Sequence, residues 1–193
     1  MGISLADPPA DVDLRIAARL SALRQERGWT LEALAERTGI SRATLSRLER
    51  GETSPTAALL GRLCSAHGRT MSRLLAEAEG EPAERVLAAD QRVWVDPETG
   101  FRRRSVSPPH QGFAAEMIEG ELPAGAVITY DAAPVAGLEH HLWMLAGVLD
   151  LTVDGATHRL GAGDCLRYRL FGPTRFAASG LAPARYLLAM VRP

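Results

Sequence analysis

The chain of 193 residues contains no lysine and no asparagine, and it has only two cysteines. Its strongly basic side chains are therefore all arginines, whose planar guanidinium groups suit base edges and phosphates. Cys64 and Cys165 lie far apart in the sequence and are flanked by apolar residues, so we expect two separate, buried thiols in a reducing compartment. This cysteine content is not that of a disulfide-rich secreted protein.

Long apolar segments are also missing. No run approaches the roughly 20 apolar residues of a membrane span. The opening MGISLADPPADVDL lacks the basic and apolar regions of a secretory signal, so we expect a cytoplasmic protein without a membrane partner. The length allows one large or two small domains. A hydrophobic content of 46% with 23% charged residues is typical of soluble proteins.

Charge is distributed unevenly along the chain. Residues 1–76 contain eleven arginines against eight acidic residues, a net charge of +3. Residues 77–193 contain eleven arginines against fifteen acidic residues, a net charge of −4. The first part is therefore where a nucleic acid would bind most favourably.

The pattern of apolar residues changes once along the chain. We expect a loose tail over residues 1–10, a compact helical domain over 11–76, a linker over 77–91 and a β-rich domain over 92–193. Beyond the linker, short apolar runs punctuated by Gly, Pro and Asp about every ten residues predict an antiparallel β-sandwich or barrel. Five helices are predicted in the helical domain, over about residues 12–27, 31–37, 41–50 and 55–67 and in a last segment around Leu74 and Leu75.

Residues 30–51, TLEALAERTGISRATLSRLERG, are the most informative segment. Thr30 and Ser41 are predicted to cap two short helices, and Gly39 supplies the left-handed conformation that ends the first. On the second helix the leucines share one side, while small residues and arginines occupy the other. Such a surface suits insertion into a DNA major groove. An ordinary amphipathic hairpin with a solvated basic face is the alternative.

Residues 14–76 resemble the Xre family of helix-turn-helix domains, which includes the phage lambda-type repressors. The match is carried by the gap-free run LxxLRxERGWTLEALAERTGISRATLSRLERGETSPT. The resemblance implies a five-helix, lambda-repressor-like domain that binds double-stranded DNA as a dimer on a near-palindromic operator. It implies a structural ion pair between Arg24 and Glu49, and the helical wheel also places Glu49 toward the core, where a carboxylate needs a partner. The implied DNA contacts are Arg42, Ala43, Arg47, Thr44 and Ser46 for base reading, and Thr30, Leu31, Arg50, Thr53 and Ser54 for phosphates.

Residues 92–193 resemble a small cupin barrel, an antiparallel double-stranded β-helix related to the jelly rolls. The match is carried by LxGxLxLTVDG at residues 145–155 and HRLGAGDCLRYR at residues 158–169. Aligning the two metal-binding motifs of that family places His140 at one ligand position and leaves the other three with unsuitable side chains. The resemblance therefore implies a barrel with no metal and no cofactor.

A barrel without a metal still has an interior that a small molecule can occupy. Strand alternation places His140 on one face with its apolar neighbours, and Arg103, Arg167, Arg169 or Arg175 could clamp a carboxylate. Core packing or a dimer interface is the alternative at any single position. The candidate pocket residues are His140, Leu142, Met144, Tyr168, Arg167, Thr174, Phe176 and Tyr130.

Together, the two resemblances imply a two-domain transcription regulator, not an enzyme. The barrel would sense a small metabolite, with a carboxylate-bearing one as an option, and the homodimer would change its affinity for the operator. One alternative is an enzyme similar to the iron-dependent phosphonate epoxidases, which share this domain order but need a His-His-Glu triad. Another is a regulator whose barrel serves only as a dimerisation scaffold.

Overall fold

The computed structural model describes residues 9–79, 84–110 and 112–193. The predicted tail over residues 1–10 and the predicted linker over residues 77–91 fall partly outside the described residues. Local signals fix the helix ends, since the Thr30 and Ser41 hydroxyls each accept a hydrogen bond from a backbone N–H of the first turn. The helices of the described part are α1 Pro9–Glu26, α2 Leu31–Thr38, α3 Arg42–Glu49, α4 Ala57–His67 and α5 Met71–Glu79.

Three helix ends differ from the sequence prediction by two residues or more. The first helix begins at Pro9 rather than near residue 12, because proline is tolerated in a first helical turn. The fourth helix is capped by Thr56, whose hydroxyl accepts from the Leu59 N–H, so it begins at Ala57 rather than at residue 55. The last helix continues to Glu79 because the Ala-Glu-Ala-Glu segment that ends it favours helix.

The described strands form two antiparallel sheets packed face to face. One sheet has the order β1-β2-β3-β10-β5-β8, and the other has the order β4-β9-β6-β7. An Asp-Gly turn with positive φ at both residues (50° and 77°) joins β6 to β7, as hairpins of this length favour. The strands are β1 Val93–Val95, β2 Arg102–Ser107, β3 Ala115–Leu122, β4 Val127–Tyr130, β5 Leu138–Ala146, β6 Val148–Val153, β7 Ala156–Gly161, β8 Cys165–Leu170, β9 Thr174–Ala178 and β10 Ala184–Val191.

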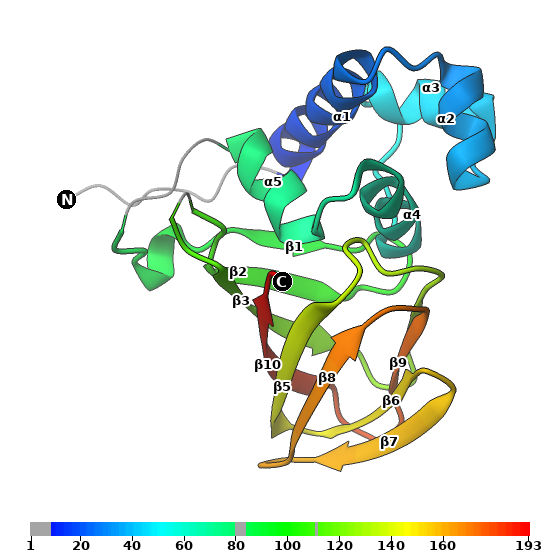
Figure 1. Cartoon of the computed structure of the whole chain (residues 1–193). Helices are drawn as coiled ribbons and strands as arrows, with labels where there is room; N and C mark the ends of the chain where they lie inside the picture. The colour runs from blue at the N-terminus through cyan, green and yellow to red at the C-terminus, as the bar shows by residue number, and fades with distance from the viewer. Residues whose placement is uncertain (1–8, 80–83, 111) are drawn as a thin grey trace.

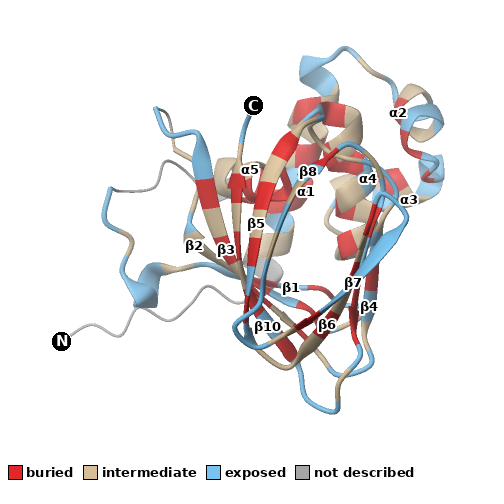
Figure 2. Cartoon of the chain, turned by 60° about the horizontal axis from the view of Figure 1, so that its bottom comes forward, coloured by how far each residue is buried: buried red, intermediate tan, exposed pale blue. Residues whose placement is uncertain are grey.

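Side chains alternate between the barrel interior and its surface. Buried positions follow every second residue along β3, β5, β6 and β10, so the strands present their apolar faces to one another (Figure 2). The prediction of two buried thiols is half wrong. Cys64 is buried, but Cys165 is exposed because it opens β8 on the outer face, opposite the half-exposed Trp143 of β5.

The helices gather at one end of the barrel, with α4 and α5 next to the strands and α2 and α3 farthest from them (Figure 1). The barrel contributes directly to a helix end, because Asp96 of the β1–β2 turn accepts a hydrogen bond of 3.0 Å from the Ala57 N–H at the start of α4. Farther along α4, Arg62 donates to Asp131 at 2.9 Å. Two side-chain contacts therefore hold α4 on the barrel.

Replacing Asp96 with alanine is expected to lower the free energy of unfolding by about 2 kcal/mol, because buried N–H groups lose their acceptor. The Asp96 side chain is buried and also accepts from the Thr99 N–H at 3.2 Å. Thermal unfolding followed by circular dichroism measures the change. The matched control is Glu98→Ala in the same turn, whose exposed side chain should cost little. Equal losses in the two variants would contradict the capping role.

Candidate nucleic-acid interface and interdomain cavity

Helices α2 and α3 form a helix-turn-helix unit. Gly39 at φ 66° donates its N–H to the Ala35 carbonyl and ends α2, and Ser41 then caps α3 with a 3.1 Å bond from the Thr44 N–H. Leu45 and Leu48 on α3 are almost completely buried. This anchoring leaves the opposite side of α3 in solvent, on the part of the molecule that lies away from the barrel (Figure 1).

The outer face of α3 is basic. Arg42, Ala43, Arg47 and Arg50 are exposed, and Thr44 and Ser46 are half-buried beside them. Two of the arginines already have acidic neighbours, since Arg42 pairs with Glu32 of α2, and Arg50 contacts Glu52 at 2.6 Å and also bonds to Ser46. Within the described residues, Arg47 forms no side-chain hydrogen bond or ion pair. Exposed pairs of this kind are weak, so a phosphate or base edge can replace them.

The residues predicted to bind phosphates differ in their exposure and in whether their side chains already form hydrogen bonds. Leu31 is half-buried at the start of α2, and Thr53 is exposed between α3 and α4. The Thr30 hydroxyl already accepts a bond from the Ala33 N–H as the cap of α2. The Ser54 hydroxyl bonds to Asp13 of α1. At the start of α2, the first-turn backbone N–H groups that Thr30 does not accept from are therefore donors that the chain can offer an anion.

Arg24 and Glu49 connect α1 to the end of α3. The Arg24 Nε and Nη2 atoms donate to the two carboxylate oxygens of Glu49 at 2.7 and 2.8 Å, and Nη1 donates to the Trp29 carbonyl at 2.9 Å. The bond to Glu49 is the main cause that raises the pKa of Arg24. The two side chains are only 16% and 9% exposed, so the pair joins α1 to the end of α3 largely in the interior.

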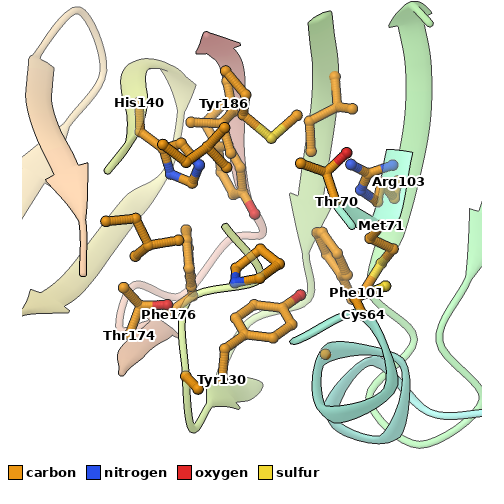
Figure 3. A pocket seen from close by; sticks show the side chains of 18 residues that line it. Cys64, Thr70, Met71, Phe101, Arg103, Tyr130, His140, Thr174, Phe176 and Tyr186 are labelled. Carbon is orange, nitrogen blue, oxygen red and sulfur yellow. The ribbon is translucent and has the colours of Figure 1, made fainter. Parts of the chain in front are cut away.

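A cavity of about 90 Å³ lies inside the open end of the barrel, beneath the helices (Figure 3). Most of its lining is apolar or aromatic, as in small-molecule sites. The barrel contributes polar groups from Arg103, His140, Tyr130 and Thr174. The lining residues that come from the helical domain are Gly61, Cys64, Thr70 and Met71.

The candidate pocket of the sequence analysis coincides with this cavity only in part. His140, Tyr130, Thr174 and Phe176 line it. Leu142 and Met144 are instead fully buried core residues farther along β5.

Tyr168 lies behind the cavity lining and bonds through its hydroxyl to His140 Nδ1 at 2.9 Å. Of the four arginines considered as carboxylate clamps, Arg103 lines the cavity. The other three, at 167, 169 and 175, are exposed. The lining residues of the helical domain were missed because no sequence signal shows how the two domains dock. Tyr186 of β10 was also missed, although alternation along that strand could have placed it inside the barrel.

Burial controls the charge states around the cavity. Desolvation lowers the pKa of His140 to about 4, with the positive charge of Arg103 as a further cause, so the imidazole is neutral at pH 7. Desolvation also raises the pKa of Tyr130 and of the Cys64 thiol to about 12, so both stay protonated. Burial raises the pKa of Glu116, which lies on β3 near Arg103, while the Arg103 charge opposes that shift.

Metal ligands do not gather in the described part of the chain. No group of three His, Cys, Asp or Glu side chains is placed there to hold an ion. His140 is the one residue that the cupin motif places at a metal-ligand position. Its Nδ1 is hydrogen-bonded to the Tyr168 hydroxyl and not to another His, Cys, Asp or Glu side chain. Nor does any described helix have the length and apolarity needed to cross a membrane.

The arrangement of α2 and α3 is matched by known proteins. A helix-turn-helix family model, HTH_3, matches residues 20–74. The HTH-type transcriptional regulator SutR of Escherichia coli K12 is 28% identical over 159 residues, which cover 79% of this chain and 81% of SutR. The chain belongs to the HTH_3, or Xre, family of transcriptional regulators. As an HTH_3 regulator it binds DNA.

The similarity to HTH_3 regulators extends beyond the helices. The HTH-type transcriptional regulator PuuR of Escherichia coli K12 is 25% identical over 186 residues, which cover 93% of this chain and 96% of PuuR. A crystal structure of an HTH_3 family transcriptional regulator from Vibrio cholerae superposes with a TM-score of 0.79 at 24% identity and covers 96% of this chain and 99% of that one. The predicted fold is thus confirmed as a five-helix domain followed by an antiparallel, cupin-like β-sandwich.

Proposed function

We propose that this HTH_3 regulator reads a specific DNA sequence through α3 and that its cavity binds a small molecule that changes its affinity for that DNA. The observation that carries the proposal is the exposed basic face of α3, held by buried leucines and the Arg24–Glu49 pair. The proposed units are residues 11–76 for DNA binding and 92–193 for sensing, joined through 77–91. The cavity supports the sensing role because it is mostly apolar and contains a few polar groups.

The proposed DNA contacts divide into two classes. Arg42, Ala43 and Arg47, with Thr44 and Ser46 at the margin, read base edges from the exposed side of α3. Arg50, Thr53 and Ser54, with the start of α2 at Thr30 and Leu31, position the domain on phosphates. Arginine forms paired hydrogen bonds with guanine, and a small residue such as alanine allows close approach. Base contacts specify the sequence, whereas phosphate contacts add affinity to any duplex.

Arg47→Ala and Arg50→Ala are expected to separate these two classes. Arg47→Ala should reduce discrimination between an operator and a scrambled duplex by about 1–3 kcal/mol. Arg50→Ala should weaken binding to both duplexes alike and make the salt dependence less steep. Titration of both variants with the two duplexes at several salt concentrations makes the comparison. Equal losses on both duplexes for Arg47→Ala would contradict base reading.

We propose a homodimer as the binding unit. Two helix-turn-helix domains reach adjacent major grooves when their recognition helices lie about one helical turn of DNA apart, roughly 34–36 Å. A ligand that binds one dimer arrangement more tightly than another shifts this spacing and therefore the affinity for the operator. A near-palindromic binding site is the expected consequence.

We propose a regulatory rather than an enzymatic role. The full-length relatives SutR and PuuR are transcriptional regulators, and the described residues bring no three metal-ligating side chains together. A metal analysis of the purified chain discriminates between the two roles. Stoichiometric iron or zinc would favour a metal-dependent enzyme of the epoxidase type instead.

A further inference from the structure

Both domains line the cavity. Gly61 and Cys64 of α4 and Thr70 and Met71 at the start of α5 form one wall, while β-strand residues form the remainder. At Gly61 the barrel approaches so closely that an added Cβ would lie 2.6 Å from the Tyr130 ring. A molecule in the cavity therefore touches the DNA-binding domain directly.

Arg103 on β2 is a buried cation at this wall. Its side chain is 5% exposed, and its guanidinium donates to the hydroxyl of Ser72 in α5. Within the described residues no carboxylate lies at ion-pair distance from it. The carboxyl group of Glu116 is nearby but forms no ion pair with Arg103, and its buried Oε1 has no hydrogen-bond partner among the described residues. A buried guanidinium without a carboxylate in contact is costly, so this position favours an anion.

His140 on β5 offers a second polar group. Its Nδ1 is bonded to Tyr168, but its buried Nε2 has no hydrogen-bond partner. The imidazole and the Arg103 guanidinium lie on opposite sides of the cavity (Figure 3). Most of the remaining lining is apolar or aromatic, including Phe101, Phe176 and Leu188.

We propose that the cavity binds a short-chain carboxylate, with the carboxylate on Arg103 and the hydrocarbon part in the apolar centre, and that the bound molecule fixes α4 and the start of α5 against the barrel. This inference rests on the proposed sensing function. It specifies the class of ligand and the contacts through which ligand binding affects the DNA-binding domain. A volume of about 90 Å³ is smaller than the roughly 150 Å³ cavity that holds benzene, so only a compact chain fits.

The route of coupling is short. A carboxylate on Arg103 accepts from guanidinium N–H groups that do not donate to Ser72, so it binds the same cation as α5. The hydrocarbon part packs on Tyr130, which contacts α4 at Gly61. Both contacts belong to the helical domain, and α4 follows the recognition helix directly in the chain. Ligand binding and DNA binding are therefore linked, and by thermodynamic reciprocity each changes the affinity for the other.

Isothermal titration of the full chain with butyrate, and with butyramide as a neutral molecule of the same shape, tests the ligand class. Butyrate should bind at least about tenfold more tightly than butyramide, because charge-assisted hydrogen bonds are the stronger ones. Arg103→Met should remove this preference, whereas Arg175→Met, at an exposed arginine on β9, should keep it. Equal binding of the two molecules, or no binding by any straight-chain carboxylate from acetate to hexanoate, would overturn the proposal. The comparison of the two molecules in the unaltered chain does not depend on how well the variants fold.

Gly61→Ala tests whether the helical domain is part of the site. Alanine favours helix, so the variant should fold, but its Cβ must displace the Tyr130 ring. Butyrate affinity should fall at least about tenfold if the wall belongs to the site. An unchanged affinity, with folding verified by circular dichroism, would limit the site to the barrel and overturn the proposed coupling.

A DNA titration with and without butyrate separates this inference from the proposed function. A change in DNA affinity of at least threefold is expected at saturating butyrate. Butyrate binding without any change in DNA affinity would overturn the coupling alone. A chain that binds butyrate but no specific DNA at all would overturn the proposed function and leave the carboxylate site standing.

Discussion

Replacing Glu49 with alanine is expected to lower the free energy of unfolding of the helical domain by about 3 kcal/mol. The Arg24 and Glu49 side chains are only 16% and 9% exposed, and two hydrogen bonds join them. Removing the carboxylate leaves a guanidinium in the interior with the Trp29 carbonyl as its remaining acceptor. Breaking a buried pair by removing one partner is costly because a charge stays buried without its partner.

Glu52→Ala is the matched control for this experiment. Glu52 also pairs with an arginine, but the Arg50 and Glu52 side chains are 54% and 50% exposed. Its loss should change stability by no more than about 0.5 kcal/mol. Thermal unfolding followed at 222 nm measures both variants. Similar effects in the two would show that the Arg24–Glu49 pair does not hold α3 in place.

Acidification is expected to destabilise the protein through His140 by about 3 kcal/mol between pH 6.5 and pH 4. The pKa of His140 is lowered by burial from its ordinary value of 6.5 to about 4 in the folded chain. Below pH 6.5 the unfolded chain therefore takes up a proton that the folded chain does not accept until about pH 4. The unfolded state binds more protons in this window, so stability falls as the pH falls.

The His140→Gln variant measures this contribution, because glutamine can still bond to Tyr168 but does not titrate. The variant should show a shallower loss of stability between pH 6.5 and pH 4 in urea unfolding. His67 in the helical domain also has a pKa lowered by burial, but it is present in both proteins and its contribution cancels. The exposed His158→Gln is the control and should keep the full slope. An unchanged slope for His140→Gln would contradict a neutral, buried imidazole.

The DNA-binding domain could be predicted from local signals. Thr30 and Ser41 as caps and Gly39 as a helix end act within a few residues of themselves, so the sequence contains the whole helix-turn-helix geometry. Some helix bounds were missed, such as the start of α1 at Pro9. Proline can occupy several positions around a helix start, so its presence does not fix the first helical residue.

The cavity could be predicted only in part, because its walls depend on packing between distant segments. Strand alternation identified His140, Thr174 and Phe176 as inward residues of the barrel. Strand alternation did not distinguish Arg103 from the other three arginines considered as carboxylate clamps. The burial of Arg103 depends on the position of β2, which pairs with β1 and β3 and lies next to α5, where Ser72 accepts its hydrogen bond. The contribution of Gly61 arises from docking between the domains, for which the chain has no local signal.

Selection of binding sites from a pool of random-sequence duplexes tests the central claim most directly. The full chain should enrich a near-palindromic sequence with half-sites about one helical turn apart. The Arg47→Ala variant should enrich the same site with relaxed preference at one position of each half-site. Failure of the folded, unaltered chain to enrich any sequence, or identical preferences of the two proteins at every position, would contradict sequence reading by α3.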